Sequence, residues 1–193
     1  MKVIKYPENL FIKKIQNFKN VQNNSPEDLM ISVLSSSNME WYNFNKEKKT
    51  EKTNQDFKYI SKINPNDYYT KLKYKIVFEA NGTEYSIIKY VLYDKKKEYG
   101  FAESMKKINN KWYTTTDSGI TNFVFFMGMI DVKYIEAIFN NSKSDSPLLN
   151  KIITQSQENG KINLSKILTE IQNSLGKNDI EIISILDPQR IFK

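Results

Sequence analysis

The segment from residue 71 to residue 93 constrains the fold of this chain more than any other. Apolar residues alternate with lysines from Lys71 to Phe78, the pattern of a half-buried β-strand. Asn81-Gly82 follows, a dipeptide that favours the two-residue turn of a β-hairpin. A second apolar run then extends from Tyr85 to Tyr93. The pattern therefore predicts two antiparallel strands joined by a tight turn.

A two-residue turn also predicts the register of this hairpin, because side chains directly opposite each other share a face. The second strand is apolar on its other face as well, at Ile88, Tyr90 and Leu92. We therefore expect it to be central and covered on both faces, with the C-terminal extension or a second subunit as the outer cover. The predicted pairs on the core face are Phe78 with Tyr85, Ile76 with Ile87, Tyr74 with Lys89 and Leu72 with Val91.

The remaining elements are read from turn residues and apolar spacing. A third strand is predicted over 99–108, and a fourth over 111–116 after the Asn109-Asn110 turn. Helices are predicted over 9–21, from Ser25-Pro26 onward, over 53–63, 120–139 and 164–175, and from Ser146-Pro147 onward, with a short late strand over 180–186.

These elements predict an α+β protein. Its antiparallel sheet of about four to five strands is expected to pack on the N-terminal helices. The predicted domains are residues 1–140, ending in the apolar helix, and residues 141–193, a mainly helical extension packed on the same core.

Composition excludes several kinds of chemistry. The chain has no cysteine and no histidine, which removes thiol nucleophiles, disulfides, zinc thiolate sites and the commonest general base. Its formal net charge is +7, but Arg190 is the only arginine, so specific nucleic-acid recognition is not expected. We expect no cofactor and no metal. Non-specific binding of polyanions by the lysines stays open.

The order of the elements resembles the NTF2-like (SnoaL-like) cone fold over residues 25 to 116. The segments that carry the resemblance are Asn81–Tyr85 and Ile108–Tyr113, the second of which holds Lys-Trp-Tyr. The resemblance implies a strongly curved sheet wrapped around helices, with a pocket inside the cone. Members include small-molecule isomerases and hydrolases, and also pure binding or scaffold domains. Their enzymes use an Asp–His pair or a Tyr–Asp oxyanion site, and without histidine the first is absent here.

Two positions on the predicted sheet are candidates for a ligand pocket. Glu103 lies between Phe101 and Met105 on one face, and on a concave face its carboxyl would have a raised pKa. The commoner alternative is an outward, solvated glutamate. Lys89 faces Tyr74 on the predicted core face, where it either loses its water or extends to solvent at a strand end.

Aromatic residues supply the remaining candidates. Trp41, Tyr42 and Trp112 line either a ligand pocket or an ordinary core. The helix predicted over 120–139 is apolar nearly all round, which indicates either a helix buried between two layers or an interface with a partner or a second copy. Its candidate interface residues are Phe123, Phe126, Met127 and Ile130.

Two functions remain open at this point. The first is a non-enzymatic binding or protein-interaction domain, an accessory or immunity-like bacterial factor, favoured by the missing histidine and cysteine. The alternative is a small-molecule-binding protein or enzyme that uses Glu103 and Tyr74 in the cone pocket. The start of the chain lacks the apolar stretch of a signal peptide, and no apolar run approaches the ~20 residues of a membrane span. We expect a cytoplasmic protein, or a secreted or periplasmic one if a signal peptide has been removed.

Overall fold

The computed structural model of the chain forms two compact units, residues 1–120 and residues 121–193. It describes residues 2–8, 10–49, 68–94, 97–117, 120, 124, 128–139, 142–158, 161–176 and 184–186. The division falls at residue 120, whereas the sequence analysis places it at residue 140. Packing of the C-terminal part on the core of the first unit stays a prediction, and each unit is described by itself below.

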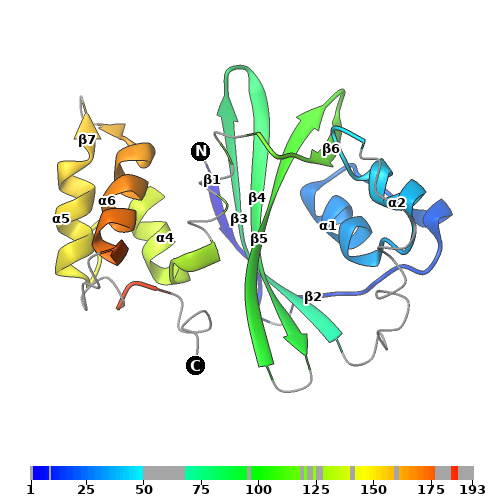
Figure 1. Cartoon of the computed structure of the whole chain (residues 1–193), viewed down its shortest axis with the longest axis horizontal. Coiled ribbons are helices and arrows are strands. Elements are labelled where there is room, and N and C mark those ends of the chain that lie inside the picture. Colours follow the sequence, from blue (N-terminus) through cyan, green and yellow to red (C-terminus); the bar gives the residue numbers. More distant parts are fainter. Residues whose placement is uncertain are drawn as a thin grey trace. The chain divides into compact units, whose positions relative to one another are not determined.

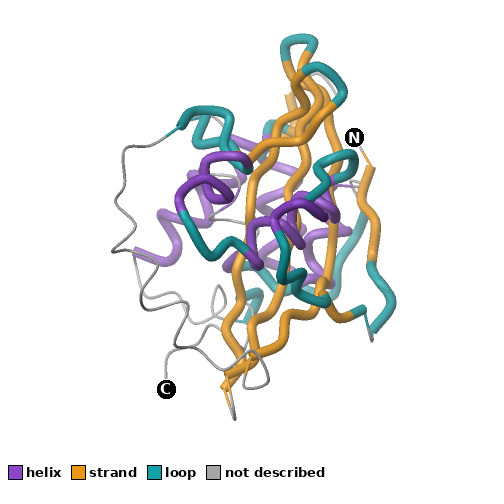
Figure 2. The backbone as a smooth tube through the Cα atoms, turned by 90° about the vertical axis from the view of Figure 1, so that its right-hand side faces the viewer, coloured by secondary structure: helices purple, strands orange, loops and turns teal. Residues whose placement is uncertain are grey.

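An antiparallel sheet of six strands forms the centre of the first unit (Figure 1). Three long strands, seen lengthwise in Figure 2, make up most of it: β3 (Tyr68–Ala80), β4 (Thr83–Asp94) and β5 (Lys97–Ile108). The short strand β6 (Lys111–Thr114) pairs with β5, while β1 (Lys2–Lys5) and β2 (Phe11–Ile12) both pair with β3. The prediction of an α+β chain with an antiparallel sheet is confirmed.

The two tight turns predicted from asparagine are also present. Asn81 and Gly82 have φ of 51° and 72°, and Asn109 and Asn110 have φ of 49° and 62°. Asparagine and glycine tolerate this left-handed region better than other residues do, and two such residues in succession suit the right-handed twist of a hairpin. The hairpins β3–β4 and β5–β6 therefore form where the sequence predicts them.

The N-terminal residues differ from the prediction. In place of a helix over 9–21, the chain forms β2 and a short 3-10 helix, η1 (Phe18–Asn20). Phe11 and Ile12 pair with Lys71 and Thr70 of β3, so the apolar spacing that suggests a helix is used for strand pairing instead. The helix predicted over 53–63 lies outside the described residues.

Two helices follow, α1 (Pro26–Ser35) and α2 (Met39–Phe44). The predicted start of α1 is confirmed: the Ser25 hydroxyl accepts a hydrogen bond from the Asp28 N–H, and the Asp28 carboxylate accepts one from the Ser25 N–H. This reciprocal capping satisfies two backbone donors that the first turn leaves free.

A β-bulge at Lys73 changes the predicted register of the hairpin. Tyr74 pairs with Lys89 as predicted, but Leu72 pairs with Tyr90 instead of Val91. The extra residue reverses the faces beyond it. The bulge lies where the outer edge of β3 changes partner, because the Lys73 carbonyl accepts a hydrogen bond from the Tyr6 N–H at 3.0 Å just beyond the end of β1. Leu72 therefore faces the same side of the sheet as Ile88.

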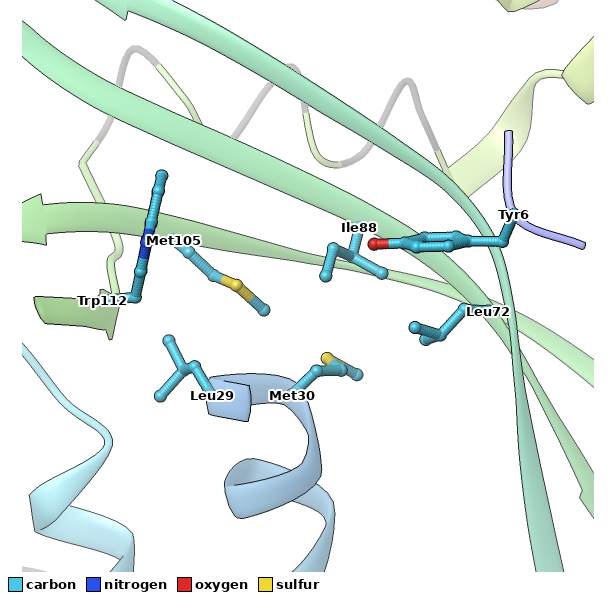
Figure 3. Packing of buried hydrophobic residues seen from close by; sticks show 7 residues of the cluster. All are labelled: Tyr6, Leu29, Met30, Leu72, Ile88, Met105 and Trp112. Atoms are coloured by element: carbon cyan, nitrogen blue, oxygen red, sulfur yellow. The ribbon is translucent and has the colours of Figure 1, made fainter. Parts of the chain in front are cut away.

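Helix α1 covers that side of the sheet, which the sequence analysis assigns to the C-terminal extension or a second subunit. Leu29 and Met30 of α1 contact a buried cluster that includes Ile88 (Figure 3). Helix α1 provides this cover because its apolar side chains pack against the outer face of β4. The other members of the cluster are Tyr6, Leu72, Met105 and Trp112.

Strand β4 is buried on both faces, as predicted. Ile87 and Ile88 point to opposite sides of the sheet, and both are 0% exposed. Val91, on the side of Ile87, is also 0% exposed. A strand of this kind is central to the core.

Polar contacts between buried groups fix α1 and α2 to the sheet. The Asn45 side chain accepts a hydrogen bond from the Ser32 hydroxyl and donates one to the Ser36 hydroxyl at 2.7 Å. Its backbone carbonyl accepts from the Thr114 N–H of β6 at 2.7 Å. One buried residue after α2 thus joins both helices to β6.

A second contact joins α1 to β1 and β3. The Glu27 carboxylate accepts hydrogen bonds from the Tyr6 hydroxyl at 2.6 Å and from the Lys75 ammonium at 2.5 Å. Burial raises the pKa of Glu27, but the hydrogen bonds from Lys75 and Tyr6 outweigh burial and hold this pKa below its ordinary value. Burial and the same carboxylate raise the pKa of Tyr6.

The second unit contains α4 (Val132–Phe139), α5 (Pro147–Gln155) and α6 (Leu164–Gly176), with a small hairpin of β7 (Gln157–Glu158) and β8 (Lys161–Ile162). The predicted helices from Ser146-Pro147 and over 164–175 are confirmed, and the hairpin is not predicted from the sequence. None of the helices described has the length and apolar character that crossing a membrane requires.

The helix predicted as continuous over 120–139 is interrupted. Ile130 forms a β-bridge with Leu186, and the Asp131 N–H donates to the Ile185 carbonyl at 2.9 Å. Helix α4 then begins at Val132, with the Asp131 carboxylate accepting from the Lys133 N–H at 3.1 Å. Pairing with residues 185–186 replaces the helical bonds at this point. Of the predicted late strand, only residues 184–186 are described.

Replacing Asn45 by alanine tests whether its amide holds the helices in place. We expect Asn45→Ala to lower the free energy of unfolding by about 2–3 kcal/mol, because buried partners lose their hydrogen bonds. Urea denaturation measures this, with the exposed Asn24→Ala as the matched control. A loss no larger than that of the control would contradict a structural role for the Asn45 side chain.

Candidate functional site

The predicted pair of Glu103 and Tyr74 does not share a face of the sheet. Glu103 pairs with Ile88, so it lies on the face that α1 covers. Tyr74 pairs with Lys89, whose side chain points to the opposite face. Tyr74 and Lys89 are 3% and 1% exposed, so both side chains are buried on that face. A site formed jointly by Glu103 and Tyr74 is therefore not present.

Glu103 lies in an apolar environment on the helix-covered face. Burial raises the pKa of its carboxyl, and the Lys46 ammonium opposes this shift. Tyr90 lies on the same face, one step along β4, and burial together with the negative charge of Glu103 raises the pKa of its phenol. The predicted alternative of a fully solvated Glu103 does not fit this environment.

The aromatic candidates are parts of the core. The Trp41 indole donates a hydrogen bond to the Ser32 hydroxyl at 2.9 Å and is 1% exposed. Trp112 belongs to the cluster under α1 (Figure 3). Tyr42 is half-buried on α2, with the Lys46 ammonium 4.9 Å from the centre of its ring.

Only one of the four predicted interface residues is described. Ile130 is 0% exposed and pairs with Leu186 inside the second unit. Phe123, Phe126 and Met127 lie outside the described residues, so their role as an interface stays a prediction.

An open hollow of about 630 Å³ lies between α2 and the β5–β6 hairpin, and we call it the α2 hollow. This volume is within the range of small-molecule sites. Its apolar lining consists of Phe18, Phe44, Ile108 and Tyr113. Its polar lining consists of Glu40, Asn43, Lys46, Glu47, Lys49 and Asn109.

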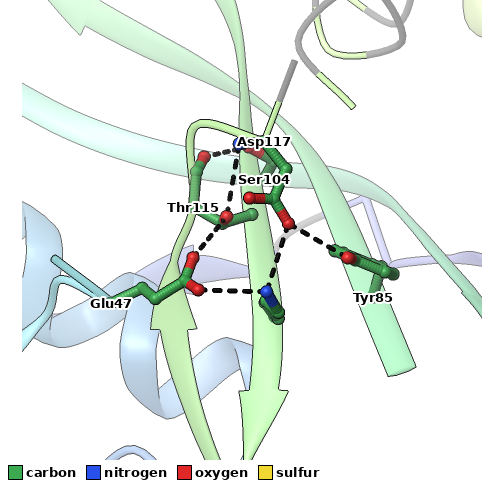
Figure 4. A network of polar contacts seen from close by, with 6 residues as sticks. Glu47, Tyr85, Ser104, Thr115 and Asp117 are labelled. Carbon is green, nitrogen blue, oxygen red and sulfur yellow. Dashed lines mark hydrogen bonds and ion pairs between the residues drawn. The ribbon is translucent and has the colours of Figure 1, made fainter. Parts of the chain in front are cut away.

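A polar network fixes one side of this hollow (Figure 4). The Lys106 ammonium contacts the carboxylates of Glu47 at 3.0 Å and Asp117 at 3.3 Å. The Thr115 hydroxyl donates to Glu47 at 2.8 Å, and the Tyr85 hydroxyl donates to Asp117 at 3.0 Å. The bond to Glu47 raises the pKa of Lys106. Although burial opposes it, the bonds from Tyr85 and Lys106 lower the pKa of Asp117. The network holds the segment after α2 against β5.

Exposed apolar side chains gather at one end of the sheet, where β3 and β5 begin. Five large hydrophobic residues are exposed in the described part of the chain, and we call their location the aromatic end. The register places them at one end of the sheet, because residues 69–72 of β3 lie opposite residues 90–93 of β4, which lie opposite residues 98–101 of β5. Phe11 and Tyr69 share one face of the sheet, and Tyr99 and Phe101 share the other. The five residues are Leu10, Phe11, Tyr69, Tyr99 and Phe101.

Ring contacts at the aromatic end hold its side chains in fixed positions. Phe11 meets Tyr69 edge-on with ring centres 5.3 Å apart, and Tyr69 stacks on Tyr93 at 4.3 Å. Burial and a hydrogen bond to Glu98 raise the pKa of Tyr93 to about 12, so its hydroxyl stays protonated and bonded near neutral pH. On the other face of the sheet, Phe101 stacks on Tyr90 at 5.6 Å.

Sequence reasoning misses both the α2 hollow and the aromatic end. The lining of the hollow comes from segments whose approach depends on α2 and β6 packing together. The aromatic end has a sequence signal, because Tyr69, Tyr93 and Tyr99 lie near the ends of predicted strands, where cover by helices is least expected. Phe11 joins them only because residues 11–12 form a strand.

Comparison with known proteins adds no relative. The chain matches no protein-family model, and neither a curated protein nor a solved structure is detectably similar to it. Within the described residues, no group of three or more acidic side chains is arranged to hold a metal ion. The residues themselves therefore carry the functional argument.

The Glu103 carboxyl provides a test of its own environment. When a carboxyl has a higher pKa in the folded state than in the unfolded state, the folded protein loses stability as the pH rises. The loss begins at the unfolded pKa, about 4.3, and is complete above the folded pKa. We therefore expect Glu103→Gln to raise the melting temperature at pH 7 by about 2–4 °C, the shift that ~1 kcal/mol produces in a chain of this size. The gain should vanish near pH 4, as thermal unfolding followed by circular dichroism can measure.

The exposed Glu8→Gln serves as the control, because its carboxyl loses little water on folding. A Glu103→Gln variant that is less stable than the parent protein at pH 7 would show that the carboxylate is ionised and well bonded instead.

Proposed function

We propose that the protein is a non-enzymatic binding or protein-interaction domain, an accessory or immunity-like factor built on a cone-like sheet. The observation that carries this proposal is the aromatic end, where Phe11 and Tyr69 are exposed on one face of the sheet and Tyr99 and Phe101 on the other. Exposed apolar groups that lie together are typical of interaction surfaces, and aromatic residues dominate their energetics.

Two features support a binding role for this end. Its rings are held by stacking and by the hydrogen bond of Tyr93, so little conformational entropy remains to be lost on binding. Lys71 lies beside it, with its ammonium 6.0 Å from the centre of the Phe11 ring. A partner with an apolar centre and an acidic rim fits this arrangement.

The missing histidine and cysteine favour the same proposal. The polar networks around Glu27, Asn45 and Lys106 connect the helices and the segment after α2 to the strands, which is a structural task.

A small-molecule-binding protein or enzyme is the second candidate. The observation that favours it is the Glu103 carboxyl, which keeps a raised pKa beside the Tyr90 phenol on the helix-covered face. Tyr90 replaces Tyr74 in this version, because Tyr74 lies on the other face. Desolvated carboxyls of this kind are more frequent at functional sites than elsewhere.

Removing the two most exposed rings tests the first candidate. We expect the double variant Phe11→Ala, Tyr69→Ala to lose proteins that the immobilised parent chain captures from a cell extract, because the centre of the aromatic end is gone. Phe78→Ala, which removes a stacked ring at the opposite end of the sheet, is the matched control. Quantitative mass spectrometry compares the captured proteins.

Light scattering extends the test to self-association. A parent chain that is dimeric and a double variant that is monomeric would identify a second copy as the partner. Identical captured proteins and identical mass for the parent and the double variant would contradict a binding role for the aromatic end.

A further inference from the structure

The α2 hollow has an apolar wall that suits a planar ring. Phe18 and Phe44 meet edge-on with ring centres 5.5 Å apart, and Ile108 and Tyr113 come from the facing hairpin. A flat ligand between these groups contacts apolar surface on two sides. Apolar walls with a few polar groups at the rim are typical of small-molecule sites.

The walls of the hollow are held in place before any ligand arrives. The Asn45 carbonyl accepts from both the backbone N–H and the hydroxyl of Thr114, at 2.7 and 3.1 Å, which fixes the end of α2 to β6. On the facing side, the left-handed residues Asn109 and Asn110 set the tight turn between β5 and β6. A fixed site needs little ordering on binding, so even a modest set of contacts yields measurable affinity.

The charges at the rim favour an anion. Both carboxylate oxygens of Glu47 are engaged, one by the Lys106 ammonium and the other by the Thr115 hydroxyl. Glu40 lies in the first turn of α2, where the positive end of the helix dipole offsets its charge. Lys46 stacks over the Tyr42 ring, a contact that leaves its charge intact. Lys46 and Lys49 are therefore the two cations of the lining that can approach an anion in the hollow, and Lys46 also acts on the Glu103 carboxyl.

We propose that the α2 hollow binds a small planar-ring compound that carries a carboxylate, with the ring between the apolar walls and the anion beside Lys46 and Lys49. This site lies apart from the aromatic end and does not depend on the function proposed for it. The shape requirement comes from the ring walls, and the charge requirement comes from the two lysines.

Calorimetry at low ionic strength tests the proposal with two matched probes, naphthalene-2-carboxylate and the neutral naphthalene-2-carboxamide. We expect the carboxylate to bind more tightly than the carboxamide. The variant Lys46→Gln, Lys49→Gln should weaken carboxylate binding by about fivefold or more, the loss expected from two partly exposed ion pairs. Binding of the carboxamide should stay unchanged in this variant.

Three further variants separate a built site from general attraction to a basic protein. Tyr113→Ala should weaken both probes, because it removes one wall. Lys13→Gln, at an exposed lysine away from the hollow, should change neither. Phe11→Ala, Tyr69→Ala should also leave both unchanged, which keeps this test independent of the aromatic end.

The proposal is overturned by equal affinity for the two probes, by absence of carboxylate binding, or by a Lys13→Gln effect as large as that of the double lysine variant. A Tyr113→Ala variant that folds normally and binds both probes like the parent chain would also overturn it.

Discussion

Burial of β4 on both faces is the constraint on which the first unit depends. With Ile87 and Ile88 both withdrawn from water, the strand cannot exist as part of a one-sided sheet. Helix α1 meets this demand on one side, and its position there is secured by Glu27 toward β1 and β3 and by Asn45 toward β6. Hydrophobic burial thus supplies the driving force, while a few buried polar groups select one placement of the helices.

The sequence predicts the central sheet well, because strand alternation and tight turns depend only on residues that are close together in the chain. Alternation from Lys71, the Asn81-Gly82 turn and the Asn109-Asn110 turn each specify their own backbone geometry. The bulge at Lys73 has no such local signal. The alternation around it is regular, and the interruption arises from β1 and β2 sharing one edge of β3. The face to which Leu72 points follows from that interruption, so it could not be read from the hairpin alone.

The candidate sites follow the same division. The strand position of Glu103 is predicted by the sequence, but its environment depends on which face α1 covers. The sequence does not predict the register between β4 and β5, which places Glu103 opposite Ile88 and on the other face from Tyr74. The α2 hollow needs Phe18, Phe44 and Tyr113 to come together from three segments, and that is a property of packing. Sequence periodicity does not predict which side chains from distant segments pack together.

The outer edge of β6 is already occupied by the chain itself. The Trp112 N–H donates to the Asn23 carbonyl, and the Glu47 N–H donates to the Thr114 carbonyl. An open strand edge invites pairing with other molecules and with it fibrous growth. At the opposite border of the sheet lie the short strands β1 and β2, of four and two residues, and β1 has a lysine at either end. A second strand therefore finds no free backbone along β6, and only short stretches of it along β1 and β2.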